Sequence, residues 1–291
     1  MIDLLMSVHP AVLLVLLLAA AAFLFWQDNG LRVTEYTASF SDLPEAFEGF
    51  SIMQVSDYHN ASLMEDKIVS ATTLAKPDMI AITGDLVDSR HTNIPAGLRL
   101  AEKLSKISPI YYIPGNHEAR IAEYPSIRDT LESYGITVLE NRTQLLVHKT
   151  RHITLIGLLD PRFYGLPKSE RQKGKTDKLG KYYIRELNRL SSSVQGFSLL
   201  LAHRPEFMPE YSQAYIDLAL TGHAHGGQFS IPFTDIGVYV PNQGLFPKYT
   251  AGLKKEGRTV GIISRGIGNS SFPFRLFNRP ELVKITLKKD E

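Results

Sequence analysis

Short apolar runs recur between residues 50 and 221 of this 291-residue chain, and longer segments separate them. The runs are four to seven residues long, the length of a buried strand. We predict strands at residues 50–55, 79–83, 110–113, 153–159, 197–202 and 218–221. Apolar residues at helical spacing predict helices at residues 66–75, 96–107 and 127–134. Strands that alternate with helices in this way favour an α/β sheet over a sandwich of hairpins.

Polar motifs follow five of these runs. In chain order they supply Asp57 and His59, then Asp85, then Asn116 and His117, then His203, and finally His223 and His225. A single Asp after a strand is more often a helix cap, and a single His is more often structural. Here, however, five of the nine histidines stand in these motifs. Because loops at the carboxyl ends of strands meet at the ligand crevice of open α/β sheets, we expect these side chains to lie together.

The donor types predict a metal site. Imidazole, carboxylate and amide groups without sulfur suit Mn²⁺, Fe²⁺ or Zn²⁺, and the absence of cysteine excludes thiolate ligands. So many candidate donors exceed the four ligands of one tetrahedral zinc, so we expect two divalent ions. Gly84 lets the carboxylate of Asp85 approach both ions. Two such ions, two carboxylates and a hydroxide leave about one positive charge, which attracts a phosphate oxyanion.

The series Asp57-x-His59, Gly84-Asp85, Gly115-Asn116-His117-Glu118, His203 and Gly222-His223-x-His225 resembles the calcineurin-like metallophosphoesterase superfamily. All five motifs occur in order between residues 57 and 225. The segments 222–228 and 264–268 resemble the bacterial branch that carries an N-terminal membrane segment. The resemblance implies an α/β fold, a four-layer α/β/β/α sandwich of two mixed sheets flanked by helices. The metals would lie between the sheets at their loop ends.

The resemblance also implies a role for each residue. One metal would be held by Asp57, His59 and His225, the other by Asn116, His203 and His223, with Asp85 bridging them. His117 would serve as a catalytic proton donor or charge stabiliser rather than a ligand, the alternative being that it only supports its turn. A metal-bridging hydroxide would attack phosphorus directly. Tyr58 and Glu118 depart from the common pattern, but neither replaces a ligand.

Residues 4–26 form the most apolar stretch, interrupted only by Ser7 and His9. Twenty-three helical residues rise about 35 Å, enough to cross a hydrocarbon core of about 30 Å. We predict a single-pass anchor in the cell membrane within residues 1–30 and a catalytic domain over residues 31–291. The alternatives are a cleaved signal peptide and a buried core helix. No Lys or Arg precedes the apolar run, as a signal peptide would require, and a helix apolar on every side suits lipid better than the surface of a domain. Arg32 is the only basic residue near either end of this stretch, so the distribution of positive charge does not set the orientation of the segment in the membrane.

Composition excludes disorder, since 44% of residues are hydrophobic and 21% are charged. The net charge of +2 predicts no specific nucleic-acid partner. Residues 168–189 contain eight basic and three acidic residues, which we interpret as a solvated loop and helix face, with a basic lid for anionic lipid as the alternative. Arg162 and Arg265 are candidates for phosphate contact. We interpret Phe163, Tyr164, Leu166, Phe272, Phe274, Leu276 and Phe277 as core rather than as an apolar rim near the bilayer.

These observations predict a membrane-anchored, metal-dependent phosphoric ester hydrolase. Its substrate would be a phosphomonoester or phosphodiester, with lipid and lipid-linked phosphoesters included. The sequence assigns no protein partner. A non-catalytic metal-binding scaffold at the membrane is the alternative, but such a scaffold is expected to have lost ligands, and all seven are present.

Overall fold

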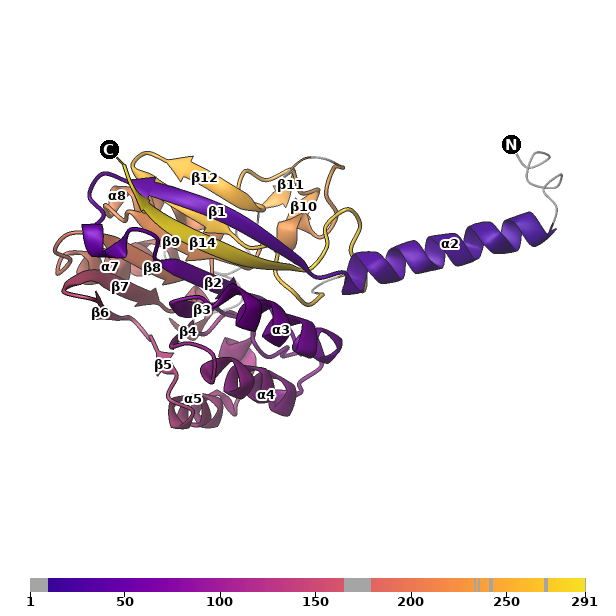
Figure 1. The fold of residues 1–291 in the computed structure, drawn as a ribbon, viewed down its shortest axis with the longest axis horizontal. Coiled ribbons are helices and arrows are strands. Elements are labelled where there is room, and N and C mark those ends of the chain that lie inside the picture. Colours follow the sequence, from indigo (N-terminus) through magenta and orange to yellow (C-terminus); the bar gives the residue numbers. More distant parts are fainter. Residues whose placement is uncertain are drawn as a thin grey trace.

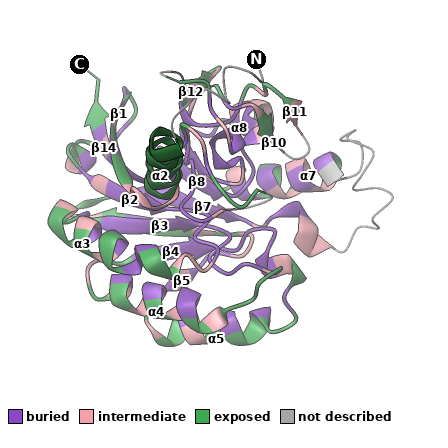
Figure 2. Ribbon diagram, turned by 90° about the vertical axis from the view of Figure 1, so that its right-hand side faces the viewer, coloured by how far each residue is buried: buried purple, intermediate pink, exposed green. Residues whose placement is uncertain are grey.

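The computed structural model describes residues 10–164, 179–232, 234, 236–240, 243–269 and 272–290. Two packed sheets with helices on their outer faces form the domain, and the helix α2 (Pro10–Asn29) projects from one end of it (Figure 1). Figure 2 looks along α2 onto that end. The predicted four-layer sandwich is therefore confirmed.

The first sheet has six strands in the order β1-β14-β2-β3-β4-β5. Their bounds are β1 (Arg32–Phe40), β2 (Ser51–Val55), β3 (Met79–Thr83), β4 (Ile110–Ile113), β5 (Thr137–Val138) and β14 (Glu281–Lys289). Strands β2 to β5 are parallel, whereas β14 runs antiparallel to β2. The outer face of this first sheet packs on the helices α3 (Glu65–Ala75), α4 (Ile94–Ser105) and α5 (Tyr124–Ser133) (Figure 2).

The second sheet also has six strands, in the order β12-β13-β9-β8-β7-β6. Their bounds are β6 (Arg142–His148), β7 (Arg151–Leu158), β8 (Ser198–Ala202), β9 (Leu218–Thr221), β12 (Gly252–Glu256) and β13 (Thr259–Ile263). The four inner strands are parallel and the two edge strands antiparallel. Helices α7 (Leu179–Ser191) and α8 (Met208–Gln213) pack on its outer face.

Short elements complete the chain. Strands β10 (Tyr239–Val240) and β11 (Gly244–Leu245) pair as a small antiparallel ladder. The 3₁₀ helices are η1 (Glu45–Phe47), η2 (Ser62–Met64), η3 (Glu118–Arg120), η4 (Pro161–Tyr164), η5 (Pro205–Phe207) and η6 (His225–Gly227). Several of them lie in the loops that follow the sheet strands.

A core between the two sheets holds them together. Alternate residues of β2, β3 and β14 face alternate residues of β7 and β8 there, among them Ile52, Met79, Leu155, Leu199 and Leu287, all fully buried. Because a strand directs successive side chains to opposite faces, the residues between them pack on the helices instead. Such strands are buried on both faces, which explains their nearly continuous apolar sequence.

The predicted elements lie close to the observed ones. Strands β3, β4 and β9 have the predicted bounds, and β2, β7 and β8 differ by one or two residues. Helix α4 begins two residues earlier than predicted because Asn93 caps it, accepting a hydrogen bond from the backbone N of Ala96 at 3.3 Å. Pro95 sits in its first turn, where the missing N–H has no cost.

Strand β1 lies in a segment that the sequence patterns leave without an element. It is an edge strand, and only three of its nine residues are buried, so it has little apolar signal. Backbone pairing with β14, in a parallel ladder of nine residues, holds β1 in the sheet instead. The patterns also miss β6, β12, β13 and β14.

Among the described residues, α2 is the one helix long and apolar enough to cross a membrane. Only 6% of its most apolar window is buried, so α2 does not pack as a core helix of the domain. Its last turns do contact the domain: the Phe23 and Phe277 rings lie 5.9 Å apart, and the Arg279 guanidinium lies 4.4 Å above the Trp26 ring. Asp28 accepts a hydrogen bond from the backbone N of Arg275 at 2.7 Å.

The strand directions place the foot of α2 and the strand-end loops at one end of the domain. Strand β1 starts at Arg32, three residues after α2 ends, and Arg32 pairs with Glu281 at the start of β14. Because β14 is antiparallel to β2, with Val283 opposite Gln54, the carboxyl end of β2 lies beside the start of β14. The loop that carries Asp57 is therefore near the foot of α2.

The core between the sheets gives a stability prediction. Replacing Leu287 with Ala should lower the free energy of unfolding by about 2–5 kcal/mol, because it leaves a cavity between β14 and the second sheet. Urea unfolding of the full chain in detergent measures this. Leu74→Ala is the matched control, since Leu74 is 86% exposed and should change the stability by about 0.5 kcal/mol at most. Equal unfolding midpoints would contradict the packing described here.

A candidate metal centre at the strand ends

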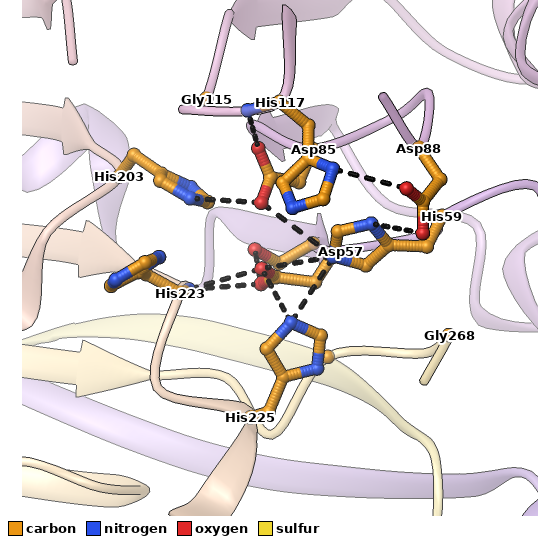
Figure 3. Close-up of polar contacts among 12 residues, drawn as sticks. Asp57, His59, Asp85, Asp88, Gly115, His117, His203, His223, His225 and Gly268 are labelled. Atoms are coloured by element: carbon orange, nitrogen blue, oxygen red, sulfur yellow. Dashed lines mark hydrogen bonds and ion pairs between the residues drawn. The ribbon is translucent and has the colours of Figure 1, made fainter. Parts of the chain in front are cut away.

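The Asp and His side chains singled out in the sequence come together where the two sheets meet at their carboxyl ends (Figure 3). One group of potential ligand atoms comes from Asp57, His59 and His225, and a second comes from Asp85, His203 and His223. His117 shares a third group with His59 and Asp85. Within each group the atoms lie within 4.8 Å of one another. Asn116 is buried in the loop after β4.

The backbone of these loops is unusual. Five of the clustered residues have positive φ angles between 44° and 62°: Asp57, His59, Asp85, His223 and His225. Non-glycine residues rarely adopt this left-handed conformation, and such strain persists where the surroundings enforce it, often at functional sites. Gly84 shows how close the loops lie, because a Cβ there would be 2.6 Å from His203 Nδ1 and 2.7 Å from Gly115 Cα.

In the first group, imidazole nitrogens converge on a carboxylate. His225 Nε2 lies 3.3 Å from Asp57 Oδ1 and 3.1 Å from His59 Nε2. Burial lowers the pKa of His59 to about 3, so its imidazole is neutral and can act as a ligand. Burial alone would raise the pKa of Asp57, but His225 outweighs this and lowers it to about 2. Asp57 is held from behind by the hydroxyl of Ser56, which donates at 2.6 Å.

Two buried atoms have no hydrogen-bond partner among the described residues: His203 Nε2, which belongs to the second group, and Asn116 Oδ1 in the loop after β4. His203 Nδ1 donates to the carbonyl of Thr83 at 2.8 Å, so Nε2 is the ring nitrogen that faces Asp85. Burial opposes protonation of His203, but Asp85 outweighs it and raises its pKa to about 10. The position therefore favours a positive charge, and these donors fit a divalent cation.

Asp85 stands between the two groups. Its Oδ2 lies 3.5 Å from His59 Nε2 and 3.3 Å from His203 Nε2, while its Oδ1 accepts a hydrogen bond from the backbone N of His117 at 2.8 Å. One carboxylate oxygen can thus reach donors of both groups. This is the geometry that a ligand shared between two ions requires.

His223 differs from the other candidate ligands. Its Nε2 lies 2.6 Å from Nη1 of Arg204, whose guanidinium pairs with Asp160 at 2.6 Å. A guanidinium only donates hydrogen bonds, so Nε2 of His223 accepts here. A neutral imidazole then carries its proton on Nδ1. Ligation through either nitrogen of His223 therefore requires Arg204 to move away from Nε2.

His117 has the opposite arrangement from His203. The backbone N–H of Ser89 donates to His117 Nδ1 at 3.0 Å, so the neutral imidazole carries its proton on Nε2. Asp88 Oδ1 lies 3.3 Å from the same Nδ1, and Asp88 Oδ2 lies 3.6 Å from His59 Nδ1. Burial alone would raise the pKa of Asp88, but its hydrogen-bonding surroundings, with donors from the Arg90 backbone and guanidinium, hold it well below its usual value. A protonated Nε2 suits a proton donor better than a ligand.

The two departures from the family pattern have clear positions. Tyr58 points away from the cluster and is buried in the core beneath α3 and α4. Glu118 is fully buried, and its carboxylate accepts hydrogen bonds from the backbone N of Asp85 at 3.0 Å, Val87 at 2.9 Å and Gly115 at 2.8 Å. It therefore fixes the loops after β3 and β4 relative to each other. Burial, and then the charge of Asp85, raise the pKa of Glu118 to about 7.

Three functional candidates were not found from the sequence: Asp88, Arg204 and Arg275. Asp88 follows Asp85 by three residues and Arg204 follows His203 directly, so a search for charges next to each motif would have found both. Arg275 is fully buried, with Nη2 3.2 Å from His225 Nδ1. It is 50 residues away from His225 in the sequence, and no local pattern marks it.

Other sequence predictions need correction. Arg265 is buried and its side chain donates to Ser230 and Asn278, so its contacts are structural rather than directed at phosphate. Phe272, Phe274 and Phe277 are between 38% and 47% exposed, so the core interpretation is wrong for them. They precede β14 in a loop rather than in a buried element. Phe163 and Tyr164 do pack against the core.

The other members of these sets have mixed outcomes. Leu276 is half-buried. Arg162 lies in η4, where its backbone N donates to Asp160 at 2.8 Å. Leu166 and residues 168–178 of the basic stretch lie outside the described residues. Lys181, Arg185 and Arg189 are partly or largely exposed on α7, as a solvated helix face would be.

Two mixed sheets with Asp and His donors clustered at their loop ends are the architecture of a metal-dependent phosphoesterase. The family model for calcineurin-like phosphoesterases matches residues 50–227, which include every motif loop of the cluster. The chain therefore belongs to the calcineurin-like phosphoesterase family and is a hydrolase. Its site contains three groups of Asp and His side chains that could each hold a metal ion.

Sequence relatives support this assignment. The chain is 31% identical to the uncharacterized metallophosphoesterase YkuE of Bacillus subtilis over 91% of its own length and 88% of the relative. It is 28% identical to the phosphodiesterase YaeI of Escherichia coli over 82% of each chain. A transmembrane protein with a metallophosphoesterase domain from Danio rerio is 27% identical over 89% of this chain and 57% of that protein.

The contacts of Glu118 generate a prediction about metal affinity. Glu118→Ala should weaken Mn²⁺ binding by about 10–100-fold, because Asp85 loses the support that positions it. Titration of the full chain with Mn²⁺ measures this affinity, with the free ion detected by electron paramagnetic resonance. Glu102→Ala is the control, since Glu102 is half-exposed on α4 and pairs with Lys106. An unchanged affinity in Glu118→Ala would show that the loops hold Asp85 without it.

Proposed function

We propose that seven side chains of this cluster hold two divalent cations and that the chain hydrolyses phosphoesters at a membrane surface. One ion would be held by Asp57, His59 and His225, and the other by Asn116, His203 and His223, with Asp85 shared between them. The position of Asp85 Oδ2 between the two donor groups is the observation that carries the proposal. Nitrogen and oxygen donors without sulfur suit Mn²⁺, Fe²⁺ or Zn²⁺.

The two cations, when bound, would hold the phosphate oxygens and lower the pKa of water to generate the nucleophile. The chain's own residues would do the remaining work. Asp57 and Asp85 would supply the negative charge that retains the ions. The neutral imidazole of His59 would present a lone pair, and His203 would do so once a cation replaces the proton on its Nε2. Arg204 places a positive charge beside His223, where it would help to attract a phosphate dianion.

His117 is proposed as the proton donor to the leaving group. The Ser89 N–H keeps the imidazole proton on Nε2, which faces the cluster rather than the loop. Asp88, next to Nδ1, would stabilise the protonated imidazole between turnovers. The ring of His117 lies 4.5 Å from that of His59, so the proton is held close to the ligand set.

Membrane attachment through α2 is the second part of the proposal. Its support is the exposure of this apolar helix and the position of its foot at the same end of the domain as the cluster. An enzyme held in this way would act on phosphoesters at the bilayer surface, lipid phosphoesters included. The membrane-bound scaffold without catalysis remains the alternative function, and the first test below separates the two.

The first test concerns the ligands. With Mn²⁺, the full chain in detergent should hydrolyse nitrophenyl phosphate monoesters or diesters, and a chelator should abolish turnover. Asn116→Ala should remove this activity because one ion loses an oxygen ligand, whereas Asn188→Ala on the exposed face of α7 should not change it. Tight Mn²⁺ binding without turnover of any phosphoester would support the scaffold instead.

The second test separates His117 from the ligands. His117→Gln should lower kcat by about 10²–10⁴-fold for a phenyl or alkyl phosphoester and should leave Mn²⁺ affinity near the wild-type value. The loss should be smaller for a nitrophenyl ester, because nitrophenolate leaves without a proton. His152→Gln, at an exposed position on β7, is the control. A loss of Mn²⁺ affinity as large as that of Asn116→Ala would make His117 a ligand.

A further inference from the structure

A groove of about 860 Å³ joins the cluster of candidate metal ligands to the foot of α2. At its inner end it is lined by His59 and Asp88, which belong to the cluster. At the other end it is lined by Asp28 and Asn29, the last residues of α2. This volume lies in the range of ligand-binding pockets. The groove therefore connects the place where a phosphate would bind to the place where the anchor leaves the bilayer.

The lining of the groove is of two kinds. Its polar side chains include Asn60, Arg90 and Asn93. It also contains Leu63 and Phe272, which are 79% and 38% exposed. Leu63 lies in the short 3₁₀ helix η2 after the Asp57 loop, and Phe272 lies in the loop that contacts the foot of α2. Apolar side chains next to a phosphate site suit an amphiphile better than a small, fully polar phosphoester.

The position of the groove relative to the bilayer indicates its occupant. The apolar part of α2 ends at Trp26, and the groove begins two residues later at Asp28. Tryptophan is enriched at membrane–water interfaces, so this level corresponds to the headgroup region. A lipid whose phosphate moves from this level to the cluster would expose methylenes of its chain to water. Each exposed methylene would lower the rate of hydrolysis about fourfold. An apolar surface along that path would remove this penalty.

We propose that this groove binds the chain-bearing part of a lipid phosphoester while its phosphate lies at the metal cluster. Leu63 and Phe272 would contact the first methylenes of the chain, and Asn60, Arg90 and Asn93 would face the polar headgroup. The proposal rests on the proposed phosphoesterase function and specifies its substrate class. Selectivity would follow from the length of the alkyl chain next to the phosphate.

Binding can be tested without relying on turnover. The full chain in lipid nanodiscs with Mn²⁺ is mixed with a dodecylphosphonate that carries a photoreactive diazirine on its chain, and the labelled peptides are mapped by mass spectrometry. We expect labelling within residues 60–64 and 272–274. Leu63→Asn should reduce it by at least about threefold, because a polar side chain removes the apolar contact. Leu74→Asn, at an 86% exposed leucine on α3 outside the groove, should leave it unchanged.

An inhibition assay gives the second readout. Dodecylphosphonate should inhibit nitrophenyl phosphate hydrolysis at a concentration at least about tenfold lower than ethylphosphonate, since it buries more methylenes. Leu63→Asn should reduce this ratio, and Leu74→Asn should keep it, which excludes simple partitioning into the lipid. Turnover with equal inhibition by both phosphonates and no labelling in the groove would overturn the inference and leave the phosphoesterase function intact. Labelling of the groove without turnover of any phosphoester would instead refute the proposed function.

Discussion

The carboxylate of Asp85 is the contact on which the arrangement of the site depends. It accepts a hydrogen bond from the backbone of His117 and lies within 3.5 Å of both His59 and His203, so it joins loops from both sheets. A buried carboxylate is stable only when polar or positive groups surround it. The loops must therefore approach it closely, which accounts for Gly84 and for the positive φ of Asp85 itself. Glu118 maintains this approach from the outer side.

The hydrogen-bond partner of Nδ1 determines whether the Nε2 of each histidine can bind a cation or donate a proton. His203 faces a backbone carbonyl, so Nδ1 keeps its proton and Nε2, which faces Asp85, is the nitrogen that could bind a cation. His117 faces a backbone N–H, so its proton lies on Nε2. Two residues of the same type, in one cluster, thus differ because the backbone offers an acceptor to one and a donor to the other. Neither partner could be identified from the motif that contains the histidine.

The sequence predicts the parts of the fold in which side-chain pattern determines structure. Strands β3 and β4 are buried on both faces, so their apolar runs mark them clearly, and the motifs that follow them locate the site. Strand β1 could not be predicted in this way because its order depends on backbone pairing with β14, which leaves no apolar pattern. For the same reason the site was predicted through its local motifs, whereas Arg275, which reaches the cluster from 50 residues away, was not.

The course of β1 also explains how the apolar helix α2 comes to lie near a candidate site built from the middle of the chain. Strand β1 is parallel to β14, which is antiparallel to β2, so the start of β1 and the end of β2 lie together. Had β1 paired in the opposite direction, α2 would leave the domain at the far end from the cluster. Arg275 connects the two regions directly, since its backbone donates to Asp28 of α2 and its guanidinium lies against His225. The foot of α2 and the candidate site are therefore linked by direct contacts through one buried arginine.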